Sequence, residues 1–410
     1  MEKYIFFTPS INKIGGAEEY INKKYSRLEN ANYMPFIFYS STEPILIPNL
    51  KSSRRFLFEE LGLCPFYFSK KQQDKLLNKI IEILQITTED NVSIESTEIS
   101  MCEWGELLAN KINAKHVCII LQEQHPYRRY FQNFLFFKYN RNELYGINEK
   151  SISLMMPEYK QIFEQRYINA QCIDVVEDVE YEFLHKIPKT DYNIGSIGRL
   201  EKNFVLYGAK QVALFASLNS DKNFNLILIG DGPEECKTAI YQSFKNVKNV
   251  NIFITGYIYP IPEQLIKKVD CFYSSSGSAR ITGNLNIPTI SMSSDGDPIG
   301  ILYYTTSQTL DKEVIYEKIE LADYLKMIII EKYCTKATPI FSLKRYDFDS
   351  EFKRQLSFFN KNVIPEYYPI RESYEINNKA ILYRIVSYLF GQRFFVFILK
   401  KMNKIKRKLL

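Results

Sequence analysis

The sequence lacks the patterns that mark disulfide-bonded, zinc-binding and membrane-spanning proteins. Its seven cysteines are odd in number and form no CxxC pair, which argues against a disulfide framework and favours a reduced, cytosolic protein. The three histidines have unrelated spacing, so no zinc or other metal site is expected. No uninterrupted apolar run approaches the ~20 residues of a spanning helix. The start, MEKYIFFTPS, has no basic stretch of the kind that opens a signal peptide, so a cytoplasmic location is expected.

Length and hydrophobicity indicate a globular chain with more than one core. At 410 residues the chain is too long for one ordinary core, and two domains of about 150–200 residues are the natural expectation. A hydrophobic content of 46% is ample for burial. The net charge of +6 is modest but unevenly distributed, because the chain from Arg393 to its end has seven Lys or Arg residues and no acid.

Short apolar runs alternate with helical patterns twice along the chain. In the first half the expected strands are KYIFFTP (3–9), MPFIFYSS (34–41), NVSIES (91–96) and KHVCIILQE (115–123), then 151–156 and 172–176. In the second half they are NIGSIG (193–198), FNLILIG (224–230), NVNIFITG (249–256), DCFYSSSG (270–277) and IPTISMS (287–293). Such alternation is typical of α/β proteins with parallel, doubly wound sheets. We predict two Rossmann-like domains, 1–185 and 186–360, followed by a helical, basic and aromatic tail over 361–410.

Glycines follow several of the expected strands. In open α/β sheets, ligands bind outside the carboxyl ends of the strands, and a helix N-terminus behind a glycine turn favours anions. A single glycine after a strand is usually only a turn, but clusters recur in both halves of the chain. They are Gly15 with Gly16, Gly195 with Gly198, Gly230 with Gly232, and Gly277.

The stretch IGSIGRLEKN adds two cations to one of these turns. Arg199 and Lys202 lie three residues apart just past a strand, where a guanidinium fork and a compact ammonium can both reach a diphosphate. The alternative is a solvated charged turn in which Glu201 pairs locally with a neighbouring cation. The glycine context favours the phosphate site.

The order of four motifs resembles the large retaining group of GT-B glycosyltransferases that build bacterial polysaccharides. IGGAEEY resembles the N-terminal GGAE loop of that family, and IGRLEKN resembles its donor-phosphate motif with the Lys closer to the Arg. LILIGDGPEE resembles its strand and GDGP turn, and VDCFYSSSG…NIPTIS resembles its G-x-P segment with Asn286 in place of Gly. The resemblance spans about residues 1–305. It implies two Rossmann-like domains facing a cleft and a metal-independent, retaining transfer from a nucleotide-diphosphate sugar.

The resemblance also implies which residues form the site. Arg199 and Lys202 would be catalytic, stabilising charge on the departing nucleoside diphosphate. The implied donor-binding residues are Gly198, Gly230, Asp231, Gly232, Gly256, Tyr257, Ser276, Gly277, Ser278, Asp295 and Asp297. The implied acceptor-binding residues are Gly15, Gly16, Glu18, Glu123 and His125, although a lone histidine is more often structural. The nucleotide sugar would be a co-substrate, and no other cofactor is expected.

One departure from the family opens alternatives. The family usually has two glutamates, eight residues apart, before the G-x-P turn, and here those positions are Tyr273 and Ile281. The chain is therefore a divergent enzyme, or Asp295 and Asp297 in SSDGDPIG take a related role, or the protein is a catalytically silent GT-B scaffold that binds a nucleotide sugar or a partner. A nicotinamide-dependent enzyme is disfavoured, because neither glycine stretch fits GxGxxG.

The C-terminal tail points to a partner. RFFVFILKKMNKIKRKLL combines an apolar run with cations, as helices in a membrane interface do. The expected acceptor is a saccharide or lipid-linked saccharide of a capsule, O-antigen or lipopolysaccharide, with the tail on the inner face of the cytoplasmic membrane. The alternative is a helix that docks back on the first domain, and both can hold together. Nucleic acid is not an expected partner, because the cations form a tail rather than an aromatic-lined groove.

Overall fold

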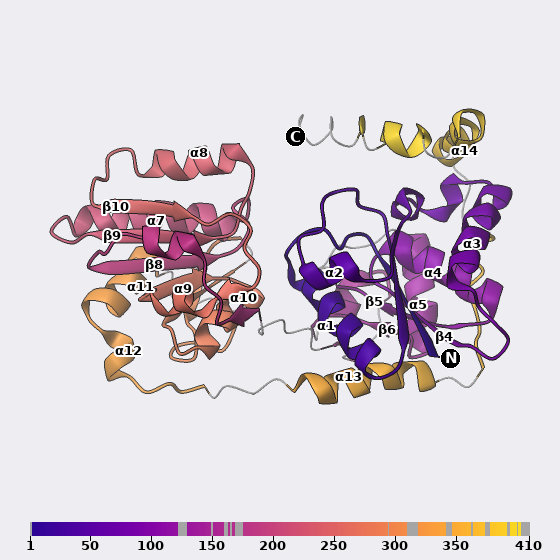
Figure 1. Cartoon of the computed structure of the whole chain (residues 1–410), viewed down its shortest axis with the longest axis horizontal. Helices are drawn as coiled ribbons and strands as arrows, with labels where there is room; N and C mark the ends of the chain where they lie inside the picture. The colour runs from indigo at the N-terminus through magenta and orange to yellow at the C-terminus, as the bar shows by residue number, and fades with distance from the viewer. Residues whose placement is uncertain are drawn as a thin grey trace. The chain divides into compact units, whose positions relative to one another are not determined.

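The computed structural model divides the chain into two compact units (Figure 1). Unit 1 contains residues 1–170 and 347–410, and unit 2 contains residues 171–346. The structure describes all residues except 1, 122–128, 149–150, 160–162, 165, 169–174, 294, 310–318, 342–346, 362–363, 374–377, 392–393, 400 and 403–410.

Unit 1 is built on a parallel six-stranded sheet in the order β3-β2-β1-β4-β5-β6. Its strands are β1 (Glu2–Thr8), β2 (Met34–Tyr39), β3 (Arg55–Leu57), β4 (Asn91–Ser96), β5 (Lys115–Ile119) and β6 (Leu144–Tyr145). Tyr4 to Phe7 in β1 have no exposed surface. Burial on both faces explains why this strand is a continuous apolar run rather than an alternating one.

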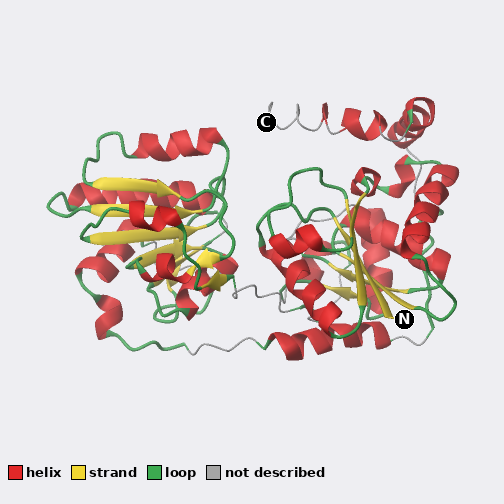
Figure 2. Ribbon diagram, in the orientation of Figure 1, coloured by secondary structure: helices red, strands yellow, loops and turns green. Residues whose placement is uncertain are grey.

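Helices cover the unit 1 sheet (Figure 2). The helices of unit 1 are α1 (Gly16–Asn30), α2 (Pro48–Ser52), α3 (Lys70–Leu84), α4 (Ile99–Ile112), α5 (Arg129–Asn140), α6 (Ser151–Met155), α13 (Phe348–Ser357) and α14 (Asn378–Phe390), with 3-10 turns at Glu59–Gly62, Pro65–Tyr67 and Phe358–Asn360. The strand predicted over 151–156 is wrong, because α6 occupies it. Most of the strand predicted over 172–176 lies outside the described residues.

Unit 2 has a second six-stranded sheet in the order β10-β9-β8-β12-β13-β14. Its strands are β8 (Tyr192–Ile197), β9 (Phe224–Ile229), β10 (Val250–Ile254), β12 (Cys271–Ser274), β13 (Thr289–Met292) and β14 (Pro298–Ile301). β14 is antiparallel to β13, and the other pairs are parallel. The helices are α7 (Asn203–Leu218), α8 (Glu234–Ser243), α9 (Glu263–Lys267), α10 (Ser276–Asn284), α11 (Leu321–Leu325) and α12 (Tyr333–Lys336), with a 3-10 turn at Glu182–Lys186, a π-helical turn at Lys326–Ile330 and a small pair of strands, β7 (Val176–Glu177) and β11 (Ile261–Pro262).

The chain returns to unit 1 earlier than the predicted domain boundary. The units divide at 170/171 and 346/347, whereas the sequence led us to expect divisions at 185/186 and 360/361. Helix α13 belongs to unit 1 because Gln355 accepts a hydrogen bond from the Tyr20 hydroxyl at 3.0 Å. Just beyond α13, the Phe358 ring stacks on Tyr145 at a centroid distance of 3.6 Å.

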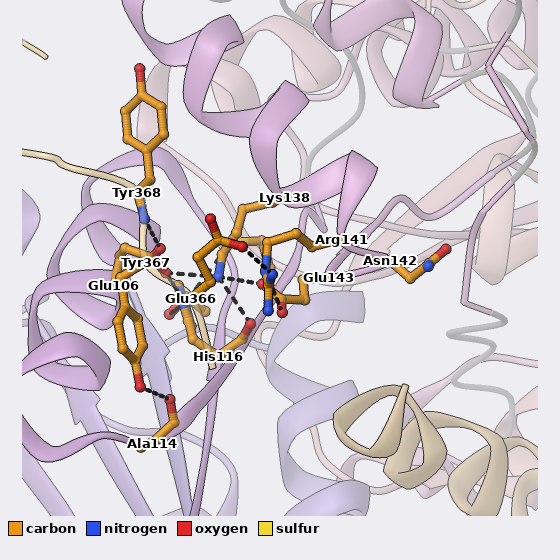
Figure 3. Close-up of polar contacts among 12 residues, drawn as sticks. Glu106, Ala114, His116, Lys138, Arg141, Asn142, Glu143, Glu366, Tyr367 and Tyr368 are labelled. Carbon is orange, nitrogen blue, oxygen red and sulfur yellow. Dashed lines mark hydrogen bonds and ion pairs between the residues drawn. The ribbon is translucent and has the colours of Figure 1, made fainter. Parts of the chain in front are cut away.

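A buried ionic cluster holds the next part of the returning segment (Figure 3). Glu106 on α4 accepts hydrogen bonds from the Tyr368 backbone N–H at 2.7 Å and from His116 Nδ1 at 2.6 Å. The Lys138 ammonium lies 2.7 Å from the same carboxylate and 2.8 Å from Glu143. The cluster satisfies these buried charges by pairing them, as a low-dielectric interior requires.

Within the described residues, no helix has both the length and the apolar character needed to cross a bilayer.

Candidate functional site

The parallel strands of unit 2 bring several turns to one edge of the sheet. β8 lies between β9 and β12, so the turns that follow these three strands are neighbours at the carboxyl edge. The β8 turn carries Arg199 and Lys202, the β9 turn carries Asp231, and the β12 turn opens helix α10. This is the edge where open α/β sheets bind ligands.

Glycines let the β8 and β9 turns pack against each other. Gly230 has φ +149°, and a Cβ there would lie 2.2 Å from the Gly198 carbonyl oxygen. A Cβ at Gly232 would lie 2.8 Å from Leu200 Cβ. The Leu200 N–H donates to the Asp231 carbonyl oxygen at 3.0 Å, which ties the two turns together. The first role of these glycines is therefore close backbone contact, and that contact fixes the loop that carries the cations.

The two predicted catalytic cations differ in their surroundings. Arg199 is half-buried, and its guanidinium lies 3.2 Å from the Glu201 carboxylate. This is the local pairing that the sequence left open as an alternative. Lys202 is exposed at the N-cap of α7, and among the described residues no ion pair or side-chain hydrogen bond engages its ammonium. The helix N-terminus and the two cations together favour a ligand of negative charge.

Asp231 pairs with a lysine that the sequence analysis did not single out. Its carboxylate lies 2.9 Å from the Lys237 ammonium on α8 and accepts a hydrogen bond from the Gly232 N–H at 2.8 Å. Partial burial acts to raise the pKa of Asp231, but the bonds from Lys237 and Gly232 outweigh it and lower that pKa. The Asp231 carboxylate therefore stabilises the turn. Asp231 precedes α8 and Lys237 lies within it, six positions later, and this spacing does not by itself predict an ion pair.

The β10 turn lies next to the β9 turn. Gly256 has φ +72° and forms an isolated bridge with Gly230. The Thr255 hydroxyl accepts from the Gly230 N–H at 3.3 Å and donates to the Gly256 carbonyl at 2.9 Å. Tyr257 follows on the surface with 43% of its area exposed, enough ring surface to stack on a ligand.

The start of α10 is an exposed helix N-terminus. Ser276 has φ +55°, a conformation that non-glycine residues rarely adopt, and its N–H donates to the Thr309 carbonyl at 2.7 Å. Gly277 is exposed, and a Cβ there would meet nothing within 4 Å. The first turn of a helix leaves backbone N–H groups without intrahelical partners, so Gly277 and Ser278 can offer theirs to an anion. No local pattern in the sequence indicates that Thr309 fixes this turn.

The positions of the two missing glutamates point into the protein. Tyr273 in β12 is completely buried, and Ile281 in α10 is buried with 8% exposure. A Cβ at Gly208 of α7 would lie 2.1 Å from the Tyr273 ring, so this ring fills the space between α7 and the sheet. A carboxylate at either position would be buried rather than offered to a ligand.

The two aspartates considered as replacements flank a tight turn between β13 and β14. The Asp297 N–H donates to Ser293 Oγ at 3.0 Å, and the Ser293 N–H donates to the Asp297 carbonyl at 2.8 Å. Gly296 has φ +103°, and a Cβ there would lie 3.3 Å from the Asn203 carbonyl at the start of α7. Asp295 and Asp297 are exposed on this turn. The turn therefore lies against the helix start that follows Lys202.

The predicted acceptor loop lies in unit 1. Gly15 is the N-cap of α1, and Gly16 is exposed at its first turn. A Cβ at Gly15 would lie 2.8 Å from the Glu18 carboxylate, so this side chain folds back over the helix start. Glu123 and His125, the other two predicted acceptor residues, lie outside the described residues.

Chemically, unit 2 offers cations, a hydroxyl-rich helix start and the first-turn backbone N–H groups of a helix on one sheet edge. In the part of the chain that the structure describes, no three His, Cys, Asp or Glu side chains cluster as metal ligands would. These groups suit a phosphorylated ligand.

Among comparisons with known proteins, the comparison of structures identifies similar folds. No protein-family model matches the chain, and no curated protein matches its sequence. A glycosyltransferase from Rickettsia africae is similar in structure with a TM-score of 0.55 and 13% identity, over 94% of this chain and 98% of that one. TarM has a TM-score of 0.53 and 11% identity, over 88% of this chain and 98% of that one. A variant of S. aureus TarM was solved with fondaparinux, alpha-GlcNAc-glycerol and UDP. It has a TM-score of 0.53 and 10% identity, over 88% of this chain and 99% of that one.

These solved structures contain two Rossmann-like domains, and the two sheets of this chain form two such domains. Identities of 10–13% fit a divergent sequence. The predicted α/β fold class is confirmed, and the chain has the GT-B fold.

Proposed function

We propose that this protein is a glycosyltransferase that moves a sugar from a nucleotide-diphosphate donor to a growing bacterial surface polysaccharide, such as a capsule, O-antigen or lipopolysaccharide. The observation that carries the proposal is the pair of cations, Arg199 and Lys202, on the glycine-built turn between β8 and α7. The GT-B fold supports it, because the similar structures include glycosyltransferases by name. The TarM variant was solved with UDP, so uridine nucleotides are the first donors to test.

In this proposal the donor diphosphate binds at the carboxyl edge of the unit 2 sheet. Arg199 exchanges its contact with Glu201 for two phosphate oxygens, and Lys202 adds a point charge. The N–H groups of Gly277 and Ser278 donate to the same diphosphate. The base packs near Gly256 and Tyr257, and the sugar faces the turn that holds Asp295 and Asp297.

The transfer then breaks the bond between the anomeric carbon and the diphosphate oxygen, and the electron pair leaves with the nucleoside diphosphate. An acceptor hydroxyl forms the new bond to the anomeric carbon and passes its proton to the departing diphosphate oxygen. Arg199 and Lys202 stabilise the charge that develops on the leaving group, which is the role a metal ion has in other transferases. We propose a metal-independent reaction with retained configuration and no cofactor beyond the nucleotide sugar.

The acceptor in this proposal is a saccharide or lipid-linked saccharide that meets the loop at Gly15, Gly16 and Glu18. Glu123 and His125, which lie outside the described residues, are the other proposed acceptor residues. A lipid-linked acceptor is borne by a membrane, and the basic C-terminal segment suits peripheral contact with the anionic inner face of the cytoplasmic membrane.

A second candidate is a catalytically silent GT-B protein that binds a nucleotide sugar or a partner enzyme. It is favoured by the burial of Tyr273 and Ile281, where the resembled family has glutamates. The enzyme and the nucleotide-binding form of this second candidate both predict nucleotide binding at Arg199, but only the enzyme predicts turnover.

The test is a thermal-shift screen of the full-length protein against UDP, GDP, ADP, CMP and their sugars. A ligand at 100 times its Kd stabilises a protein by about 2.7 kcal/mol, a readable shift. Arg199→Ala should remove the shift, whereas Lys210→Ala, at an exposed cation on the helix α7 that follows this turn, should keep it. A flat response to every nucleotide contradicts the donor site. Binding without hydrolysis or transfer of the sugar supports the silent scaffold.

A further inference from the structure

The C-terminal helix α14 is fixed to unit 1 along one side. Arg384 Nε donates to the Phe66 carbonyl at 2.8 Å, and the Ser387 hydroxyl donates to the Tyr67 carbonyl at 3.3 Å. Gln72 on α3 donates to the Ser387 carbonyl at 3.0 Å, so α14 runs beside the start of α3 (Figure 1). These contacts involve backbone carbonyls of the folded unit, so α14 is a docked element rather than a loose end.

The short helical segment after α14 is anchored in the same way. The Phe395 ring meets Phe68 edge-on at a centroid distance of 6.0 Å, and it packs against Tyr383 at 5.4 Å. Phe395 and Leu399 belong to the hydrophobic core of unit 1. Within the described residues of 378–402, one side therefore already has its partner.

The opposite side of this segment is apolar and exposed. On α14, Ile381, Ile385, Tyr388 and Leu389 follow the i, i+4, i+7, i+8 spacing of a single helix face. Tyr388 has 74% of its surface exposed. Among the described residues of this segment, the exposed apolar set is Ile381, Leu382, Ile385, Tyr388, Leu389, Phe390, Phe394, Phe397 and Met402, which we call the outer face. A helix that is apolar on both sides needs a second apolar surface to cover it.

The charge carried by the C-terminal sequence itself has one sign. Residues 376–410 contain nine Lys or Arg residues and no Asp or Glu. Two copies of such a segment would repel each other if they met face to face. An anionic surface with an apolar interior would match both the charge and the exposed side chains.

We propose that the outer face of residues 381–402 docks unit 1 on the surface of an anionic lipid bilayer. α14 has 13 residues and is about 20 Å long, short of the ~30 Å hydrocarbon core, so it lies in the interface instead of crossing it. The aromatic rings enter the boundary between headgroups and acyl chains, and the cations contact lipid phosphates. The idea that the outer face brings unit 1 to a membrane-borne acceptor rests on the proposed function. Its binding to lipid can be measured without any glycosyl transfer.

The experiment is flotation of the full-length protein with phosphatidylglycerol–phosphatidylcholine vesicles and with pure phosphatidylcholine vesicles. The wild type should float with the anionic vesicles, and high salt should weaken the binding. The double variant Leu389→Glu with Phe397→Glu should lower the vesicle-bound fraction about tenfold or more, because it sets charges in the apolar layer. Lys401→Gln should lower the binding constant about fivefold, the loss of one cation near the surface.

Two controls separate docking from misfolding and from self-association. Leu218→Glu changes an exposed leucine of unit 2 and should leave flotation unchanged. The fluorescence of Trp104, the single tryptophan, should be unchanged in every variant, since it reports the unit 1 core. Equal flotation of the wild type and the double variant overturns the proposal. The proposal is also overturned if the wild type is a dimer that floats with neither kind of vesicle and the double variant is a monomer. If the protein binds vesicles but no nucleotide, the docking surface is supported and the proposed function is contradicted.

Discussion

The Lys24 ammonium lies 2.5 Å from the Glu95 carboxylate, and both side chains are completely buried in unit 1. The hydroxyls of Tyr4 and Tyr20 donate to the same carboxylate at 2.5 and 3.0 Å. Burial lowers the pKa of Lys24, and the nearby Glu95 charge opposes that shift. Because the Tyr20 hydroxyl also lies 3.0 Å from the Gln355 side chain, this cluster connects α1, the sheet and the returning helix α13.

Removing one member of this pair should destabilise unit 1 strongly. Lys24→Met leaves the Glu95 carboxylate buried without its counter-charge, a change that typically costs about 3–5 kcal/mol. Lys24→Met combined with Glu95→Leu should recover part of the loss, because no uncompensated charge remains. Urea unfolding followed by Trp104 fluorescence measures both, since this tryptophan is buried in the unit 1 core. Lys79→Met, at an exposed lysine of α3, should stay within about 0.5 kcal/mol of the wild type. An equally small effect of Lys24→Met would contradict the buried-pair account.

The unfolding free energy of unit 1 should fall on acidification because of Glu106. Burial acts to raise the pKa of this carboxyl, but Lys138 and His116 outweigh burial and lower the pKa to about 2. The pKa of an unfolded glutamate is about 4.3. As the pH falls, the unfolded chain therefore takes up this proton before the folded chain does. The stabilisation by Glu106 is therefore present above about pH 5 and is lost as the pH falls toward 2.

The measurement is urea unfolding of the wild type and of Glu106→Gln at a series of pH values between 6 and the acid limit of folding. Glu106→Gln should be less stable at pH 6, because Lys138 loses a buried partner, and the difference from the wild type should shrink toward low pH. A difference that stays constant over the whole range would show that the Glu106 charge does not contribute.

The sequence predicted the strands well where the signal was local. The run predicted over 224–230 is β9 (Phe224–Ile229), and the run predicted over 34–41 contains β2. Such strands are buried on both faces, so a continuous apolar run is enough to find them. The glycine turns were found for a similar reason, since Gly230 has a backbone conformation and a contact that no side chain would allow.

The rest depended on contacts between distant residues. Nothing local in the sequence of α13 indicates that Gln355 meets Tyr20, 335 residues away. The short segment 151–156 has an apolar pattern that fits either a strand or a helix. In the folded protein it forms the helix α6. Two features of the candidate site, the Thr309 carbonyl behind α10 and the Lys237 partner of Asp231, likewise come from the tertiary structure.

Two glycines of the candidate site should respond differently to alanine. Gly230→Ala would force a Cβ to within 2.2 Å of the Gly198 carbonyl at φ +149°, so it should destabilise unit 2 by about 1–3 kcal/mol and weaken nucleotide binding. Gly277→Ala meets open space and should leave stability within about 0.5 kcal/mol. Thermal unfolding and nucleotide titration of both variants test this. A Gly230→Ala protein with wild-type stability and affinity would contradict the close packing of the β8 and β9 turns.

The final prediction concerns the two cations on the β8 turn. If they stabilise the departing nucleoside diphosphate, Arg199→Ala should lower kcat about 10²–10³-fold with a donor that is turned over. Arg199→Lys should recover only part of the loss, because an ammonium cannot form the two parallel bonds of a guanidinium. Glu201→Gln should strengthen donor binding, since it removes the carboxylate that holds Arg199 at 3.2 Å. Steady-state kinetics with the donor found in the thermal-shift screen separates kcat from KM for each variant. An Arg199→Ala enzyme with unchanged kcat would move the leaving-group site away from this turn, and the start of α10 would be the next place to examine.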